Sequence, residues 1–171
     1  MEDTPLLGIF DSGVGGFSVY KQIREATTAD VIYYGDCARA PYGNREDSEI
    51  ISFIKDDIRF LQDEGVTHFV NACNSMSVIT TDILLSECAI YSAHYTDMIR
   101  ALDAHASFET GTRILVIATQ ATIRSGVYQK VLSRKGCIVS TLVLQELAQM
   151  IEDNKNDQEV LDLIKEVFVL A

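Results

Sequence analysis

Residues 6–16 read LLGIFDSGVGG and decide the architecture of this chain. An apolar run that ends in Asp11 and Ser12 is typical of a buried strand, and the following run of glycines is typical of a tight loop. Apolar residues then recur at Phe17, Tyr20 and Ile23, which is helical spacing. The segment therefore predicts a strand, a glycine-rich loop and a helix.

The same pattern recurs along the chain. Strands are expected at 31–34 and 67–70, with apolar spacing after them that predicts helices through 50–61 and 76–85. Further strands are expected at 113–118 and 137–141, each followed by a helix, and a last helix at 157–170. Residues 86–105 indicate a short strand and then a helix. Strands that alternate with helices favour an α/β fold with a mostly parallel sheet. We expect a Rossmann-like parallel-sheet lobe at 1–95 and a second α/β lobe at 96–171.

Composition narrows the classes of partner. A net charge of −11, with 14 basic against 25 acidic residues, argues against a nucleic-acid partner. Such a chain can still bind a small acid through backbone N–H groups. No apolar run approaches the roughly 18–20 residues that span a bilayer, so no membrane partner is expected. Four dispersed cysteines and the lack of a signal segment favour a reduced, cytoplasmic setting.

Polar side chains follow three predicted strands, at Asp11-Ser12, Asp36-Cys37 and Cys73-Asn74. Loops after parallel strands converge on one crevice, so these residues should gather there. Cys73 at a strand-to-helix turn would have its pKa lowered from about 8.5 by the helix N-terminus, making it a usable base or nucleophile. Burial as a small apolar residue is an equally good interpretation of its position.

Other interpretations of these loops stay open at this point. The glycines at 13–16 fit either a tight turn or a ligand contact, and Asp11 fits either a turn residue or a proton acceptor. A cysteine phosphatase is excluded because Ile79 stands where such a loop needs Arg. A cysteine hydrolase would need a histidine close to the thiol, with His94 as a candidate. The spacing of Cys and His predicts no metal site.

Four strings in this order carry a resemblance to a known family. They are GIFDSGVGG at 8–16, YGDCARAPYG at 34–43, NACNS at 71–75 and VIATQAT at 116–122, the last followed by Ser125 and Tyr128. Together they resemble the glutamate racemase branch of the aspartate/glutamate racemase family. The four matches cover most of the first 130 residues.

The resemblance implies an isomerase that interconverts L- and D-glutamate without a cofactor and supplies D-glutamate for peptidoglycan. One thiolate would remove the α-proton, and a second thiol on the other lobe would return a proton to the opposite face. Cys73 matches the first thiol and Asp11 the acid that assists it. The positions that match substrate-binding residues are Ser12, Pro41, Tyr42, Gly43, Asn74, Ser75, Thr119 and Thr122. A homodimer is also implied.

This sequence departs from the family pattern in its second half. The family's second thiol lies in a Gly-Cys-Thr-His segment, which this sequence lacks, and Cys137 beside Gly136 is expected to be structural. The family's C-terminal elements are also missing, so the second lobe is expected to be incomplete. The alternative function is therefore a catalytically incomplete half-racemase that acts as a small-carboxylate binding or regulatory module.

Overall fold

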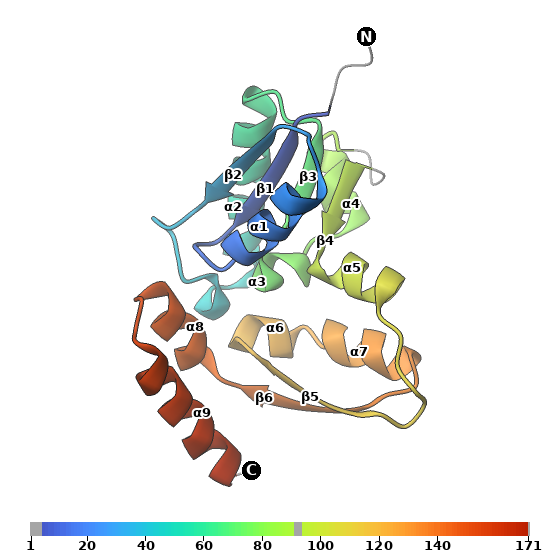
Figure 1. Cartoon of the computed structure of the whole chain (residues 1–171). Helices are drawn as coiled ribbons and strands as arrows, with labels where there is room; N and C mark the ends of the chain where they lie inside the picture. The colour runs from blue at the N-terminus through green and yellow to red at the C-terminus, as the bar shows by residue number, and fades with distance from the viewer. Residues whose placement is uncertain (1–4, 91–93, 171) are drawn as a thin grey trace.

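In the computed structural model, which describes residues 5–90 and 94–170, the strands form two parallel sheets (Figure 1). The first sheet has the order β2-β1-β3-β4, and the second pairs β5 with β6. The α/β class and the parallel sheets are confirmed. The strand bounds are β1 Leu7–Asp11, β2 Val31–Gly35, β3 His68–Asn71, β4 Tyr95–Asp97, β5 Arg113–Ala118 and β6 Ile138–Val143.

Strand β1 lies in the middle of the first sheet and fixes its register. Phe10 is paired with Tyr34 of β2 on one side and with Asn71 of β3 on the other. Because all these pairs are parallel, the carboxyl ends of the strands meet at one edge of the sheet. The loops that follow β1, β2 and β3 therefore start side by side.

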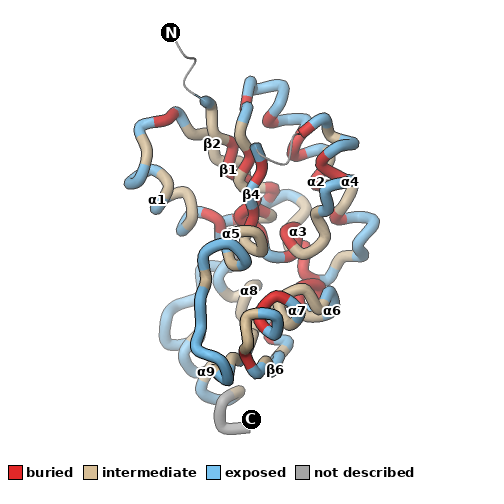
Figure 2. The backbone as a smooth tube through the Cα atoms, turned by 90° about the vertical axis from the view of Figure 1, so that its right-hand side faces the viewer, coloured by how far each residue is buried: buried red, intermediate tan, exposed pale blue. Residues whose placement is uncertain are grey.

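Helices cover both faces of the first sheet (Figures 1 and 2). Helix α2 contributes the centre of the core, because Ile50, Ile54, Ile58 and Leu61 are all fully buried against Phe10 and its neighbours. Figure 2 shows the buried residues gathered in this sheet and the helices beside it. The helices of the first lobe are α1 Phe17–Ala26, η1 Tyr42–Asn44, α2 Asp47–Asp63, α3 Asn74–Ser77, α4 Asp82–Glu87 and α5 Met98–His105.

The second lobe places α6 and α7 between its sheet and the first lobe, and α9 lies at the outer end (Figure 1). Its helices are α6 Gln120–Arg124, α7 Val127–Arg134, α8 Gln145–Glu152 and α9 Asp157–Leu170. The predicted boundary at residue 95 stays a prediction. Strand β4 pairs with β3 through Asp97, so the first sheet includes residues on both sides of that boundary.

The single helix predicted at 76–85 is wrong, because two short helices occupy this stretch. The Thr80 hydroxyl donates to the Met76 carbonyl at 2.9 Å, and the Thr81 hydroxyl accepts the Leu84 N–H at 3.2 Å. The Thr81 hydroxyl thereby caps the start of a new helix. Helix α3 therefore ends before Thr81, and α4 begins after it. The consequence is that Cys73 precedes a helix of only four residues.

We expect Ile54→Ala to lower the free energy of unfolding by about 2–5 kcal/mol, because it leaves a cavity at a fully buried position. Chemical denaturation followed by circular dichroism measures this loss. Ile83→Ala is the control, since Ile83 is 73% exposed and its truncation should cost well under about 1 kcal/mol. Equal losses in the two variants would contradict this assignment of the core.

Candidate active site

Asp11 ends β1 and organises the glycine-rich loop that follows it. Its Oδ2 atom accepts the backbone N–H groups of Gly13 and Gly16, each at 3.1 Å. A Cβ at Gly16 would lie 2.9 Å from the Asp11 Cβ and 3.0 Å from the Ala72 Cβ, so this turn has room only for glycine. Asp11 is therefore a turn-forming residue, and two of the loop N–H groups are already occupied by its carboxylate.

Cys73 lies directly after β3 and meets the loop after β1. Its N–H donates to the Asn71 Oδ1 at 3.0 Å, and its thiol donates to the Ser12 hydroxyl with an S–O distance of 3.4 Å. The side chain of Cys73 is 4% exposed. The structure thus brings together Ser12 and Cys73, as the shared sheet edge predicts.

The expectation that the pKa of Cys73 is lowered is wrong. Burial, and secondly the negative charge of Asp11, raise the pKa of this thiol to about 12. The hydrogen bond with Ser12 and the backbone N–H groups of Met76 and Ser12 oppose this rise but are weaker. A four-residue helix has only a small dipole, which is why desolvation dominates. The thiol is therefore protonated at neutral pH.

Hydroxyl groups from both lobes meet beside this thiol loop. The Ser75 hydroxyl lies 3.1 Å from that of Thr119, which in turn lies 3.1 Å from that of Thr122. Tyr128 of α7 donates to the amide oxygen of Asn74. The predicted residues Asn74, Ser75, Thr119 and Thr122 therefore form one polar contact across the two lobes.

The loop with Pro41, Tyr42 and Gly43 lies against the same contact from the first lobe. The Tyr42 hydroxyl donates to the Asp36 carboxylate, and Tyr42 is 1% exposed. The Tyr42 side chain therefore lies in the protein interior. A Cβ at Gly43 would lie 2.7 Å from the Thr119 Cβ and 2.7 Å from the Gln145 Nε2. Contact with a ligand at Tyr42 would therefore use the backbone.

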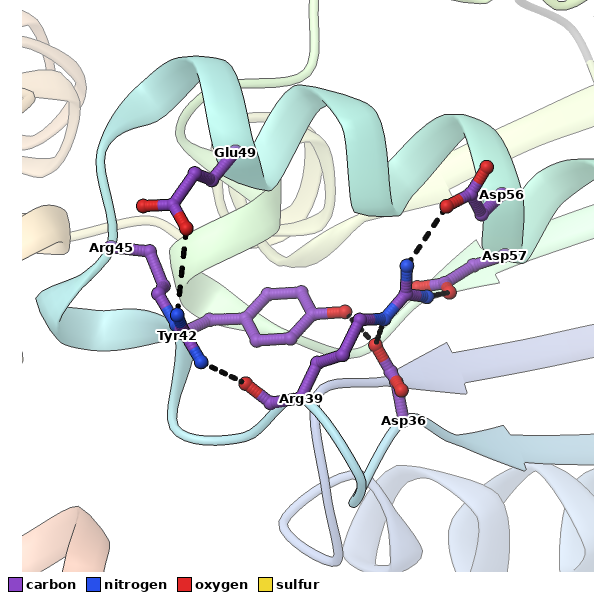
Figure 3. Close-up of polar contacts among 7 residues, drawn as sticks. All are labelled: Asp36, Arg39, Tyr42, Arg45, Glu49, Asp56 and Asp57. Atoms are coloured by element: carbon purple, nitrogen blue, oxygen red, sulfur yellow. Dashed lines mark hydrogen bonds and ion pairs between the residues drawn. The ribbon is translucent and has the colours of Figure 1, made fainter.

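Behind this loop, Arg39 binds three carboxylates (Figure 3). It contacts Asp36 through Nε, Asp56 at 2.9 Å and Asp57 at 2.8 Å. The Asp57 side chain is 0% exposed, and its Oδ2 has no hydrogen-bond partner among the described residues. Burial and the nearby charge of Asp36 raise the pKa of Asp57 to about 7.

Sequence reasoning missed this cluster, although a signal for it exists. On the helix at 47–63, Asp57 falls on the same face as Ile50, Ile54 and Leu61, which is where a carboxylate needs a partner. Arg39 lies in one of the quoted strings, but its spacing alone does not identify the three acids that it binds.

A cavity of about 710 Å³ adjoins the contact between the lobes. Asn74, Thr119, Thr122 and Tyr128 form its polar part, and apolar side chains from α5, β5 and α8 form the rest. A volume of this order is common for small-molecule sites, which combine apolar walls with a few polar groups. The polar part coincides with residues predicted to bind substrate.

The remaining thiols and histidines lie elsewhere. Cys137 is buried just before β6, at the end of the second sheet opposite the site, and Cys37 is exposed. His94 packs on His68 with ring centroids 4.5 Å apart, at the amino ends of β3 and β4. At about 3.3 Å per strand residue, His68 is on the order of 15 Å from Cys73. Neither His68 nor His94 is therefore placed to serve as the base of a cysteine hydrolase.

Within 5–90 and 94–170, no group of three or more His, Cys, Asp or Glu residues could hold a metal ion. Over the same residues, no helix is long and apolar enough to cross a membrane.

Fold and site together define a class of protein. Its members are two-lobed α/β proteins with a buried thiol at the carboxyl edge of a parallel sheet, and the loop that carries the thiol contacts hydroxyls from the second lobe. Known proteins of this class match the chain. The glutamate racemase of Aquifex aeolicus is 38% identical over 157 residues, covering 90% of this chain and 60% of its own length. The glutamate racemase of Helicobacter acinonychis is 35% identical over 159 residues, or 91% of this chain and 62% of its own length.

Solved structures agree with the sequence matches. The glutamate racemase of Campylobacter jejuni superposes with a TM-score of 0.78 at 34% identity, covering 92% of this chain and 66% of that one. That of Francisella tularensis, solved in complex with D-glutamate, gives a TM-score of 0.74 at 33% identity over 88% of this chain and 57% of that one. No protein-family model matches the chain. The chain is a homologue of the glutamate racemases, and it spans about three fifths of the length of the curated relatives it matches.

We expect Cys73 to react with iodoacetamide at pH 8 at least about 100-fold more slowly than Cys37, because a thiol of pKa about 12 is almost entirely protonated there. Mass spectrometry of peptides after timed alkylation measures the two rates. Both thiols should react alike in urea. Equal rates in the native protein would show that the Cys73 thiol is accessible to the reagent and that its pKa is not raised.

Asp57 should make stability depend on pH between about 4 and 7. Its folded pKa of about 7 exceeds the unfolded value near 3.8, so the folded state binds the extra proton and stability falls as pH rises through this window. Asp57→Asn should remove this fall, which is on the order of 3 kcal/mol at about 1.4 kcal/mol per pKa unit.

Urea unfolding at pH 4.5 and pH 7.5 measures this difference between wild type and variant. Asp56→Asn is the matched control, because Asp56 contacts the same arginine but is 54% exposed. If Asp57→Asn and Asp56→Asn show the same pH slope, Asp57 does not carry the proton.

Proposed function

We propose that this chain binds glutamate between its lobes and transfers the α-proton of glutamate through Cys73, as part of a racemase that interconverts the L- and D-isomers without a cofactor. The observation that carries the proposal is the placement of the Cys73 thiol beside Ser12 and within reach of the Asp11 charge, two residues before Ser75, whose hydroxyl meets that of Thr119 from the second lobe. The relatives named glutamate racemase, and the one solved with D-glutamate, support the choice of substrate. D-glutamate for peptidoglycan, a cytoplasmic location and a homodimer belong to the same proposal.

A protonated thiol must lose its proton before it can act as a base. The substrate ammonium group would offset the Asp11 charge that raises the pKa of Cys73. In this proposal Asp11, besides forming the turn, assists removal of the thiol proton. A thiolate formed in a buried site is a strong base, because its conjugate acid has a high pKa. Substrate binding would thus form the base only when there is an α-proton to remove.

The reaction then needs donors where charge collects. When the α-proton moves from Cα to the sulfur of Cys73, its electron pair spreads into the substrate carboxylate, which takes on more negative charge. The Asn74 amide and the Ser75 and Thr119 hydroxyls lie at the contact between the lobes and can donate to that carboxylate. The hydrogen bond between Ser75 and Thr119, and that from Tyr128 to the Asn74 oxygen, hold these donors in position before substrate arrives.

Inversion requires a second acid on the opposite face of the substrate. The three other cysteines do not supply it: Cys37 is exposed, Cys88 contacts the α2–α4 region and Cys137 lies at the far end of β6. The residues described here therefore provide one base of a two-base reaction.

Incubation with D- and L-glutamate in heavy water tests this function by following the α-proton by NMR and the isomers by chiral chromatography. Wild type should exchange the α-proton, and Cys73→Ala should lower the rate by about 10²–10⁴-fold. Cys137→Ala is the matched control, a second buried thiol outside the site, and should stay within about twofold of wild type.

Exchange with inversion would establish a complete site, and exchange of one isomer without inversion would establish a single-base site. Binding of glutamate with no exchange at all would overturn the proposed proton transfer. Loss of exchange in both cysteine variants would assign the effect to folding rather than to Cys73.

A further inference from the structure

Asn71, the last residue of β3, places a buried amide directly before the thiol loop. It alternates with Phe69 on the buried face of the strand and is 0% exposed. An apolar side chain is the ordinary occupant of such a position, because burying an amide is costly unless its hydrogen bonds are made. The oxygen and the nitrogen of this amide each have a partner. Its contribution beyond packing therefore depends on the two groups that it binds.

One of these groups is the backbone of Cys73. The Oδ1 atom of Asn71 accepts the Cys73 N–H at 3.0 Å. The Cys73 carbonyl is held as well, because it accepts the Ser77 hydroxyl at 2.7 Å. The preceding residue, Ala72, is anchored through its N–H to the Phe10 carbonyl at 2.9 Å. Both backbone groups of Cys73 are therefore fixed, and the bond at its N–H depends on a side chain.

The other group is the Tyr95 hydroxyl, which lies across the sheet on β4. The Nδ2 atom of Asn71 donates to this hydroxyl at 3.0 Å. Burial raises the pKa of Tyr95, so the hydroxyl keeps its proton. Strands β3 and β4 are paired in parallel, which ties the amide to a neighbouring strand (Figure 1). The amide cannot be turned over, because its NH₂ group would then meet the Cys73 N–H.

The anchor on Cys73 is also uncharged. An aspartate at position 71 could accept the same N–H, but its charge would add to that of Asp11, which already raises the pKa of the Cys73 thiol. A neutral amide holds the backbone without opposing the thiolate in this way. The choice of an amide at position 71 thus suits a thiol that has to lose its proton.

We infer that Asn71 is a positioning residue for the proton transfer, whose side-chain oxygen holds the Cys73 backbone so that the thiol stays aligned with the α-carbon of the bound amino acid. This inference rests on the proposed function. Asn71 is fully buried and touches neither the substrate nor the transferred proton. A shift of about 1 Å in a reacting group can lower a rate roughly 100-fold, so loss of the anchor should act on turnover rather than on binding.

Exchange of the α-proton of glutamate in heavy water, followed at several glutamate concentrations, tests the inference in Asn71→Val and Asn71→Ala. Both variants remove the acceptor of the Cys73 N–H. Valine suits a buried strand, and alanine avoids overpacking if valine prevents folding. The kcat should fall about 100-fold, while KM stays within about threefold of wild type.

Tyr95→Phe is the matched control. It removes the buried hydrogen bond at the other end of the same amide but leaves the bond from the Cys73 N–H to Asn71, so its kcat should stay within about threefold of wild type. An equal loss of kcat in Tyr95→Phe would assign the effect to the packing of β3 on β4 and overturn the inference. Wild-type kcat in a folded Asn71 variant would overturn it too.

Amide hydrogen exchange measured by NMR tests the anchor without using turnover. Loss of the Asn71 oxygen should speed exchange of the Cys73 N–H at least about 10-fold. The Ala72 N–H should exchange as in wild type, because its bond to the Phe10 carbonyl is untouched. Unchanged protection of the Cys73 N–H would overturn this inference alone, with glutamate turnover by wild type intact. Absence of α-proton exchange in wild type would instead overturn the proposed function and, with it, the role of Asn71 in that reaction.

Discussion

The parallel register of β1 with both of its neighbours is the constraint on which the site depends. Because β1 is hydrogen-bonded to β2 and to β3 in the same direction, all three strands end at one edge. The Asp36 N–H binds the Asp11 carbonyl at 3.0 Å, and the Ala72 N–H binds the Phe10 carbonyl at 2.9 Å, so the pairing continues into the loops. Three loops far apart in sequence are thereby held within contact of each other, and Cys73 meets Ser12 as a direct result.

Burial at that edge then sets the chemistry. The thiol of Cys73 is removed from water, and its nearest charge is the carboxylate of Asp11, so the resting site keeps the proton on sulfur. A positive charge that entered this site would favour the thiolate, because it would offset the charge of Asp11. Under the proposed function, the amino group of the substrate would supply that charge and so link formation of the base to the presence of substrate.

The sequence pattern predicted the strands and the residues at their ends, which depend on residues close together in the chain. Apolar runs followed by Gly, Asp or Cys located the strands and the residues at their ends, because strand and loop are encoded by neighbouring residues. The break between α3 and α4 was missed, since two threonine hydroxyls outweigh the apolar spacing there. The raised pKa of Cys73 was missed for a different reason: desolvation is a property of the packed fold. The close contact of Gln145 with Gly43 was missed because the two residues lie about a hundred positions apart in the chain.

Helix η1 shows how the two lobes are joined at the site. The Tyr42 side chain points into the first lobe, where its hydroxyl donates to the Asp36 carboxylate. Asp36 in turn forms an ion pair with Arg39. One residue later, Gly43 faces outward and has no room for a side chain between Thr119 and Gln145. A loop held from behind by ion pairs and in front by close backbone contact has little freedom to shift. Gly43 therefore fixes how near the second lobe can approach, and with it the distance from Thr119 to the thiol loop.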